Sequence, residues 1–279
     1  MYKLVILVII ITLFYFLYYQ NNSLVISKLQ INSRDIPNSF NKCKIVHLSD
    51  LHNKRFGNNQ KKLVKAIKEI NPDFIVFTGD SVDSRLYNEK PALTLLSQIL
   101  EIAPVYYVTG NHEWKSGRYY TLKEKIKELG VKILDNKFSK LQKGNDYIYI
   151  MGISDPQRYS KKTRYQLFKN KLINITNKID EDKYKILLCH RPELLPLYTS
   201  QNINLVFTGH AHGGQIRLPI IGGVFVPNQG FFPKYTSGIY NEDKTKMVVS
   251  RGLGNSSIAP QRLFNRPEII VLILNKHNN

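Results

Sequence analysis

The sequence is poor in cysteine and in acidic residues, and both scarcities exclude classes of protein. Only Cys43 and Cys189 occur among 279 residues, which excludes a disulfide framework and a thiolate-ligated zinc cluster. No internal repeat or low-complexity tract is present, and 43% hydrophobic with 22% charged residues excludes a disordered chain. The length suits one large or two small domains with a sizeable core.

Acidic residues number 21 against 40 Lys and Arg, so the chain carries a net charge of +19. The basic clusters are short, such as KKTR at 161–164. The arginine-rich or aromatic-interleaved segments typical of nucleic-acid binding are absent. A domain held at an anionic lipid surface would gain attraction from this charge. We therefore rank the membrane lipid bilayer above nucleic acid as a partner, and we infer no protein partner.

A single long apolar run without charge lies at residues 4–19, LVILVIIITLFYFLYY. As a helix it would be about 24 Å long, at the short end of what spans a bilayer. A signal peptide is the alternative, but no small-x-small cleavage site follows in QNNSLVIS. We predict a membrane anchor over 1–20 and a folded domain over 24–275. Lys3 favours a domain outside the cytoplasm, although Lys28 and Arg34 weaken that bias.

Downstream, five apolar, β-rich runs each end in Asp, Asn or His. They are KIVHLSDLH (44–52), DFIVFTGD (73–80), VYYVTGNHE (105–113), KILLCHRPE (185–193) and NLVFTGHAHGG (204–214). Amphipathic segments that favour helices separate the first three runs, at 58–70, 89–102 and 118–130. This alternation predicts an α/β fold whose strand ends meet at one edge.

Two other blocks complete the predicted fold. The polar stretch 161–182 is interpreted as a helix with a loop. The C-terminal third is strand-like and is divided by Gly and Pro turns, in the segments QIRLPII, GGVFVP, KMVVSRGLG and EIIVLIL. It therefore predicts a second sheet packed on the first.

The five strand ends carry donors that suit a metal site. Imidazole, carboxylate and amide groups without a thiolate favour Mn²⁺, Fe or Zn²⁺. Their number exceeds what one ion requires and suits two ions ~3.5–4 Å apart, which would favour an anionic substrate and displacement at phosphorus. Each motif alone also fits a turn or a helix cap; five in one chain favour a site. The donors, including one candidate catalytic histidine, are Asp50, His52, Asp80, Asn111, His112, His190, His210 and His212.

The order of these motifs resembles the calcineurin-like metallophosphoesterase superfamily over about residues 24–274. The series is Asp50-x-His52, Gly79-Asp80, Gly110-Asn111-His112-Glu113, His190 and Gly209-His210-x-His212. The stretches HLSDLHN, GHAHGGQIRLP and FPKYTSGIY to SRGLG further resemble its membrane-associated bacterial branch, which includes relatives of UDP-2,3-diacylglucosamine hydrolases. The resemblance implies a four-layer αββα sandwich of two mixed β-sheets flanked by helices, here preceded by the N-terminal transmembrane helix.

The resemblance also implies a role for each donor. One metal would take Asp50, His52, Asp80 and His212. The other would take Asp80, Asn111, His190 and His210, with Asp80 as the bridge. His112 would be the catalytic histidine that protonates the leaving oxygen, and Glu113 would orient His112 or a neighbouring loop.

The predicted activity is hydrolysis of a phosphodiester or pyrophosphate bond by in-line attack of a metal-bridged hydroxide. A lipid- or nucleotide-linked substrate at the membrane is the first hypothesis for this catalytic domain. Arg191, Arg251 and Asn255 are candidate substrate-binding residues. The sequence leaves two alternatives open, a non-catalytic metal-binding scaffold of the same fold and a nucleic-acid phosphodiesterase.

Overall fold

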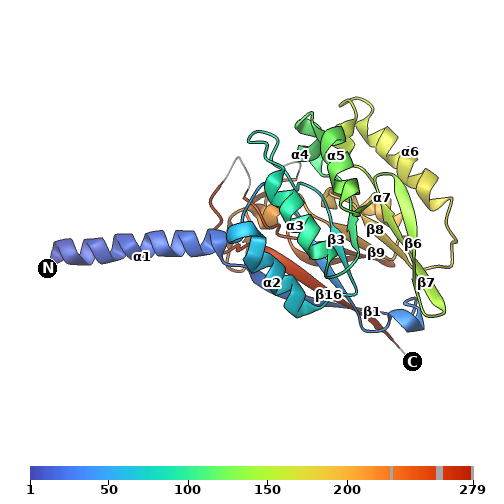
Figure 1. The fold of residues 1–279 in the computed structure, drawn as a ribbon, viewed down its shortest axis with the longest axis horizontal. Coiled ribbons are helices and arrows are strands. Elements are labelled where there is room, and N and C mark those ends of the chain that lie inside the picture. Colours follow the sequence, from blue (N-terminus) through green and yellow to red (C-terminus); the bar gives the residue numbers. More distant parts are fainter. Residues whose placement is uncertain (227–228, 256–259, 278–279) are drawn as a thin grey trace.

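Two mixed six-stranded sheets form the centre of the computed structural model, which describes residues 1–226, 229–255 and 260–277 (Figure 1). The first sheet has the order β1 (Val25–Ser33), β16 (Glu268–Lys276), β2 (Cys43–Leu48), β3 (Phe74–Phe77), β4 (Val105–Tyr107), β5 (Lys132–Ile133). The second has the order β14 (Gly238–Glu242), β15 (Thr245–Val249), β9 (Leu205–Thr208), β8 (Lys185–Leu188), β7 (Asp146–Gly152), β6 (Lys137–Lys143).

Helices cover the outer face of each sheet. Those on the first sheet are α2 (Lys61–Ile70), α3 (Lys90–Leu100) and α5 (Tyr119–Glu128). Those on the second are α6 (Arg164–Thr176) and α7 (Leu195–Thr199). In α2 the buried side chains Leu63 and Ile67 are four residues apart, so they share one face of the helix. The helix ends at Asn71, whose left-handed conformation is typical of a helix C-terminus.

The strands bury both of their faces, which explains their continuous apolar sequences. In β2, Ile45 packs into the core between the sheets, while Val46 packs outward against the helices of the first sheet. Side chains alternate in this way because successive residues of a strand point to opposite faces. Each fully buried aliphatic side chain contributes roughly 1.5–3 kcal/mol relative to exposure. The four-layer αββα arrangement predicted from the sequence is confirmed.

The apolar N-terminal segment forms helix α1 (Tyr2–Asn22), which projects away from the domain (Figure 1). Its 21 residues give a length of about 32 Å, and none of its most apolar 18-residue stretch is buried. The helix is therefore long and apolar enough to cross a bilayer. The last two turns of the helix contact the domain, where the ring of Phe16 lies 5.9 Å from that of Phe264. The division into an anchor over 1–20 and a domain over 24–275 stays a prediction.

The C-terminal third differs in detail from the prediction. The segment EIIVLIL forms β16, which is inserted into the first sheet between β1 and β2, because its apolar side chains suit a strand buried on both faces. The segments QIRLPII and GGVFVP form only β10 (Arg217–Leu218), β11 (Gly222–Gly223) and β12 (Phe225–Val226), with β13 (Gly230–Phe231) after them; Pro227 lies outside the described residues. These short strands form two separate hairpins.

Candidate metal centre

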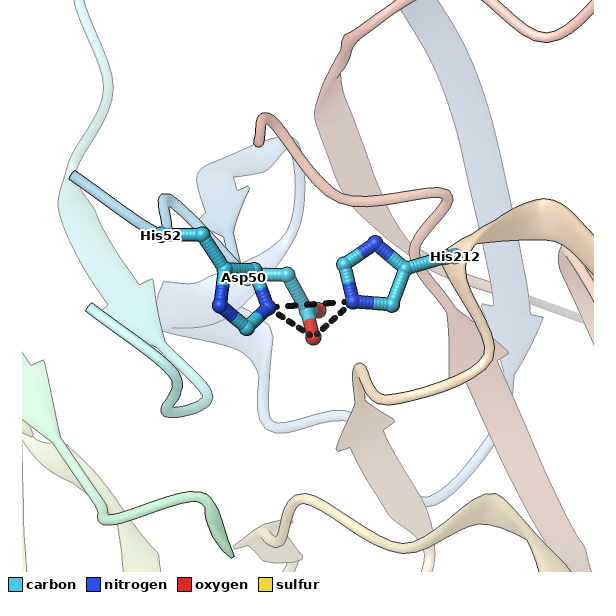
Figure 2. A group of neighbouring side chains, drawn as sticks. All are labelled: Asp50, His52 and His212. Atoms are coloured by element: carbon cyan, nitrogen blue, oxygen red, sulfur yellow. Dashed lines mark hydrogen bonds and ion pairs between the residues drawn. The ribbon is translucent and has the colours of Figure 1, made fainter. Parts of the chain in front are cut away.

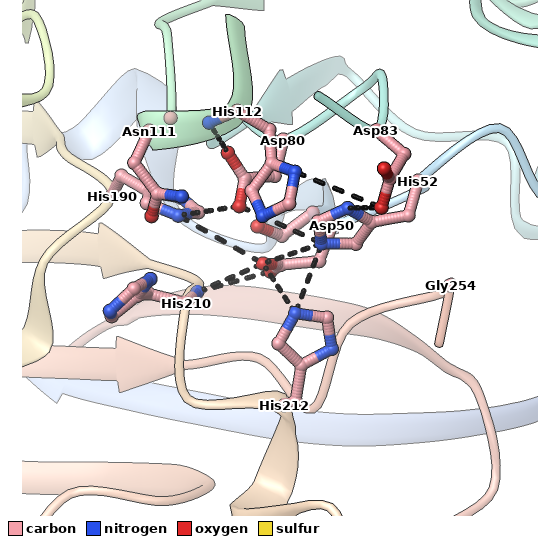
Figure 3. A network of polar contacts seen from close by, with 12 residues as sticks. Asp50, His52, Asp80, Asp83, Asn111, His112, His190, His210, His212 and Gly254 are labelled. Atoms are coloured by element: carbon pink, nitrogen blue, oxygen red, sulfur yellow. Dashed lines mark hydrogen bonds and ion pairs between the residues drawn. The ribbon is translucent and has the colours of Figure 1, made fainter. Parts of the chain in front are cut away.

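The predicted donors lie at the carboxyl ends of five strands, where loops of both sheets meet (Figure 3). β2, β3 and β4 run parallel in the first sheet, and β8 and β9 run parallel in the second. His52 and His212 are 160 positions apart in the chain, yet their rings are in contact. The fold therefore gathers the predicted donors from distant parts of the sequence at the edge where α/β sheets bind ligands.

Asp80 lies in the middle of the group. Its Oδ2 is 3.2 Å from Nε2 of His190 and 3.6 Å from Nε2 of His52. Its Oδ1 accepts a hydrogen bond of 2.7 Å from the backbone N–H of His112. One carboxylate oxygen thus faces a histidine from each sheet, which suits a ligand shared by two cations.

Asp50, His52 and His212 form a contact group beside Asp80 (Figure 2). Oδ1 of Asp50 lies 3.3 Å from Nε2 of His212 and 3.9 Å from Nε2 of His52. The two ring nitrogens are 3.0 Å apart. Two lone pairs at that distance repel each other unless a proton or a cation lies between the rings. The donor set of this group therefore fits a bound cation.

A further contact group consists of Asp80, His190 and His210, whose candidate ligand atoms all lie within 4.8 Å of one another. The backbone N–H of His210 donates to both carboxylate oxygens of Asp50, at 3.2 and 3.1 Å. Asp50 therefore links the loop after β2 to the loop after β9. The carboxylates of Asp50 and Asp80 lie next to histidines of both groups (Figure 3).

Hydrogen bonds fix the tautomers of two histidines. Nδ1 of His190 lies 2.7 Å from the carbonyl oxygen of Thr78, which can only accept, so Nδ1 carries a proton and, in the neutral ring, the lone pair is on Nε2, the nitrogen that faces Asp80. The opposite holds for His112, whose Nδ1 accepts from the backbone N–H of Ser84 at 3.0 Å. Neutral His112 therefore carries its proton on Nε2. The first arrangement leaves Nε2 available to bind a metal, and the second leaves an N–H on Nε2 that can hydrogen-bond a substrate oxygen.

The backbone at these strand ends is turned into an uncommon conformation. Five of the eight donors have positive φ angles between 45° and 66°, a region that residues other than Gly rarely occupy. They are Asp50, His52, Asp80, His210 and His212. Gly110 and Gly209 let the loops approach, because a Cβ at either position would overlap Asp80 or Ser49. Such strain is characteristic of functional sites.

The side chain of Glu113 connects the loop that carries Asp80 to the loop that carries Gly110. Its buried carboxylate accepts hydrogen bonds from the backbone N–H groups of Asp80, Ser81 and Gly110, at 2.6 to 3.0 Å. The hydroxyl of Tyr107 also donates to it, at 2.7 Å. Glu113 thus orients the loops that carry Asp80 and the start of α4 (Asn111–Lys115). Burial, together with the Asp80 carboxylate, raises the pKa of Glu113.

Arg191 lies behind the centre rather than at an open surface, with only 5% of its area exposed. Its guanidinium donates to both carboxylate oxygens of Asp155, at 2.6 and 3.1 Å. It also donates to Oδ1 of Asn111 at 3.2 Å and to Nε2 of His210 at 2.7 Å. Arg191 therefore positions two of the predicted donors, and its predicted contact with substrate stays a prediction.

Three of the histidines favour the neutral form that binds metal. Burial lowers the pKa of His52 to about 4. Burial also holds the pKa of His210 and His212 well below the usual value, with the positive charges of Arg191 and Arg262 adding to the effect. Neutral imidazole is the ligand form, so these rings need no deprotonation before a metal binds.

The carboxylates at the centre have the opposite effect on His190. Burial opposes its protonation, but Asp80 and Asp50 outweigh that effect and raise the pKa of His190 to about 10. The same attraction holds the pKa of Asp80 well below its usual value although the side chain is buried. Burial raises the pKa of Asp50 to about 6. A centre that attracts a proton this strongly attracts a metal cation for the same reason.

The other two predicted substrate-binding residues lie further out. Arg251 forms an ion pair with Glu268 at 2.9 Å, and Asn255 accepts a hydrogen bond of 2.8 Å from Nζ of Lys54. Both substrate contacts stay predictions. The sequence interpretation missed Asp155, although the apolar run before it, YIYIMGIS, ends in Asp like the runs that were recognised. It also missed Lys54, for which the sequence holds no signal; burial lowers the pKa of Lys54 to about 7.

A profile described as "Calcineurin-like phosphoesterase" matches residues 43–214, which include every donor named above. The chain belongs to this family. This metallophosphoesterase is a metal-dependent phosphoester hydrolase, as the sequence predicted. Members of the family generally use two divalent metals, and the contact groups around Asp80 fit that number.

The relatives of this metallophosphoesterase cover most of its length. It is 29% identical to "Uncharacterized metallophosphoesterase YkuE" of Bacillus subtilis, over 89% of this chain and 84% of the relative. It is 28% identical to "Phosphodiesterase YaeI" of Escherichia coli, over 83% and 82%. It is 29% identical to "Transmembrane protein with metallophosphoesterase domain" of Danio rerio, over 88% of this chain but only 56% of the relative. Phosphopantetheinyl hydrolase of Mycobacterium tuberculosis shares the fold, with a TM-score of 0.50 at 14% identity over 75% of this chain and 89% of that one.

Proposed function

We propose that this metallophosphoesterase hydrolyses a phosphodiester or pyrophosphate bond at a membrane surface, with two divalent ions at the centre of Figure 3. Asp50, His52, Asp80 and His212 would hold one ion. Asp80, Asn111, His190 and His210 would hold the other. Mn²⁺, Zn²⁺ and Fe all suit this mixture of imidazole, carboxylate and amide donors.

The observation that carries this proposal is the position of Asp80. Its Oδ2 faces His52 from one contact group and His190 from the other, at 3.6 and 3.2 Å. A residue that serves only one ion does not need ring nitrogens on both sides. The bound ions would supply positive charge that stabilises a pentavalent phosphoryl group and makes water a better nucleophile.

His112 is the residue that we assign to proton transfer. It belongs to a contact group with His52 and Asp80, but its Nδ1 accepts from Ser84, so the proton is on Nε2. The Nε2–H, on the nitrogen remote from Ser84, is arranged to hydrogen-bond a leaving oxygen, and the ring would transfer this proton from its imidazolium form, which leaves neutral imidazole behind. The backbone N–H of His112 donates a hydrogen bond to Oδ1 of Asp80, and this bond keeps the ring beside the donors.

The substrate class rests on weaker but consistent support. The relative from Escherichia coli is named a phosphodiesterase, which favours a diester over a monoester for this chain. Helix α1 and the +19 charge favour a substrate that is linked to a lipid or to a nucleotide and lies near an anionic bilayer. We place the domain on the extracytoplasmic side, because Lys3 precedes the apolar run.

The test uses the full-length protein in detergent, stripped of metal with a chelator and then given Mn²⁺ or Zn²⁺. We expect added metal to restore hydrolysis of bis(p-nitrophenyl) phosphate and of a lipid-linked pyrophosphate, with slower turnover of p-nitrophenyl phosphate. Faster turnover of the monoester would overturn the diester preference. Cleavage of DNA or RNA that falls steeply with salt would indicate a nuclease instead. Metal-loaded protein that hydrolyses no phosphoester would overturn the whole proposal.

A further inference from the structure

The two hairpins that follow His212 expose large apolar side chains to solvent. Exposed fractions range from 40% to 107%, which is unusual for a set of neighbouring residues in a water-soluble region. We call this set the apolar face, and it consists of Leu218, Ile220, Ile221, Phe231, Phe232 and Phe264. The rings of Phe225 and Phe231 lie 5.2 Å apart across the second hairpin, so its aromatic residues pack on each other and leave one side open.

The tip of the first hairpin lacks the polar and glycine residues that usually form an exposed turn. Leu218 pairs with Gly222, so the connecting loop is Pro219, Ile220 and Ile221. Short hairpin loops normally carry Gly, Asn or Asp, because they require positive φ angles. Here Ile220 has a φ of 71°, which is a strained conformation for a β-branched residue. The strained backbone is typical of functional sites, and the fully exposed isoleucine side chain would be stabilised by an apolar environment in place of water.

The apolar face is continuous with the last turns of α1. Phe264 contacts Phe16 of the helix, and the backbone N–H of Arg217 donates to the carbonyl oxygen of the neighbouring Leu263 at 3.0 Å. Arg266 donates to the hydroxyl of Tyr19 at 2.6 Å. Figure 1 shows the orange and brown C-terminal segments gathered at the base of α1. The hairpins therefore adjoin the place where the helix would leave the bilayer, a level that Tyr and Arg side chains favour.

The charge of this region matches an anionic lipid surface. From residue 215 to residue 237 the sequence contains Arg217 and Lys234 and not one Asp or Glu. Basic residues near such a surface are attracted to its anionic headgroups. Apolar side chains beside basic ones, without acidic residues, are the composition of segments that lie in a membrane interface.

We propose that the apolar face inserts into the interface of the bilayer and forms a second membrane contact beside α1. The contact is joined directly to the metal centre, because Nδ2 of Asn265 donates to the carbonyl oxygens of His212 and Gln215, at 2.7 and 3.0 Å. The loop that carries His212 is thereby held near the level of the lipid headgroups. This inference rests on the membrane location in the proposed function but not on catalysis, since the contact forms whether or not the centre is catalytic.

The experiment measures where the hairpin tip lies. A single cysteine replaces Ile220 in the full-length protein, is labelled with the polarity-sensitive dye NBD, and is reconstituted in vesicles of phosphatidylcholine and phosphatidylglycerol. Cys43 and Cys189 are buried, and burial raises the pKa of both thiols to about 12, so the label reacts at the introduced site. The matched control carries the label at Tyr165, which is 56% exposed on α6.

We expect the dye at position 220 to show a blue-shifted emission that is quenched severalfold more by doxyl-labelled lipid than the dye at position 165. Equal, water-like emission at both positions would overturn the proposal. A blue shift that depends on protein concentration and resists lipid-borne quenchers would show that a second copy of the chain covers the face instead. Phosphoester hydrolysis is measured on the same samples, so failure of the proposed function is recorded separately.

Discussion

The two regions that adjoin His212 are built in opposite ways. On one side, polar side chains converge in a buried cluster in which Asp50, Asp80 and Glu113 are almost fully removed from solvent. On the other side, the hairpins expose Ile220, Phe231 and Phe232 and bury little. The first region buries charged side chains, which costs desolvation energy. The second region exposes apolar side chains to water, which also costs free energy.

Under the two proposals above, each region is completed by a component from outside the chain, cations on one side and lipid on the other. Carboxylates and close imidazoles are stable together when cations neutralise and separate them. Exposed isoleucine and phenylalanine are stable when lipid replaces water around them. Variants that affect one region without the other test this division, and the expected effects range from complete loss of activity to almost no change.

The largest effect is expected for Asp80→Asn. Because Oδ2 of Asp80 faces donors of both contact groups, this change should remove both ions and reduce turnover to that of chelator-treated protein. Metal analysis of the purified variant checks the ion content, and Asp182→Asn on the exposed surface is the matched control. Retention of both ions by Asp80→Asn would contradict the bridging assignment.

Next in size is His112→Gln, which should lower kcat ~10²–10⁴-fold because general acid catalysis is lost. Metal content should stay at the wild-type value, since we do not assign His112 as a ligand. A substrate with a p-nitrophenol leaving group needs less protonation, so it should be affected less than an alkyl ester. Loss of metal together with activity would show that His112 is a ligand after all.

A smaller effect is expected for Asp155→Asn. Arg191 loses its charged partner, so its bonds to Asn111 and His210 weaken and the affinity for one ion falls about 10–100-fold. Competition with a chelator should then show one weakened ion and one unchanged ion. Arg191→Lys, which keeps the buried charge, should reproduce the loss if geometry matters. Equal weakening of both ions would argue for a general loss of stability.

A substitution of His47 tests how a buried histidine next to the donors makes the stability of the protein depend on pH. Burial lowers the pKa of His47 to about 3, while an unfolded histidine titrates near 6.5. The unfolded state therefore binds one more proton between these values, and stability falls as the pH drops through that window. His47→Gln should flatten the dependence of the melting temperature on pH between about 6.5 and 3, measured with chelator present.

The smallest effect is expected in the hairpins. Replacing Phe231 and Phe232 by Ser should change the free energy of unfolding in detergent by no more than ~0.5 kcal/mol per residue, because neither ring is buried by the domain. Hydrolysis of a soluble diester should also stay unchanged. The same change at buried Phe207 should cost several kcal/mol. A large loss at Phe231 would mean that the hairpins stabilise the domain itself.

The position of the donors was predictable because each follows an apolar run that can only be a buried strand. Once β2, β3, β4, β8 and β9 are recognised, their common direction places their carboxyl ends together. The α/β alternation followed from the same runs and from the helical spacing between them, and the second sheet followed from the strand-like C-terminal third. The four-layer αββα order was implied by the resemblance to the metallophosphoesterase superfamily. The family and the class of enzyme were also predictable, because the order of the motifs is specific even where each motif is not.

Other features depend on contacts that no local pattern reveals. The insertion of β16 between β1 and β2 joins residues about 240 positions apart, and many registers suit such an apolar strand. The role of Arg191 as a positioning residue depends on Asp155, which contacts it from the loop after β7. The two-residue strands of the hairpins are too short for any periodic signal, and their exposure is visible only once the rest of the chain is folded.

The contacts between α1 and the domain would fix the distance of the metal centre from a bilayer that α1 spans. Nδ2 of Asn21 donates to Gln261, and Oδ1 of Asn21 accepts from the backbone N–H of Arg262, whose guanidinium lies beneath His212. If α1 spans a bilayer as we propose, a helix that is hydrogen-bonded to the segment beside His212 would act as a spacer of constant height rather than as a flexible tether. Phosphoesters whose scissile phosphorus lies too far from the membrane plane would then stay beyond the reach of the metal centre.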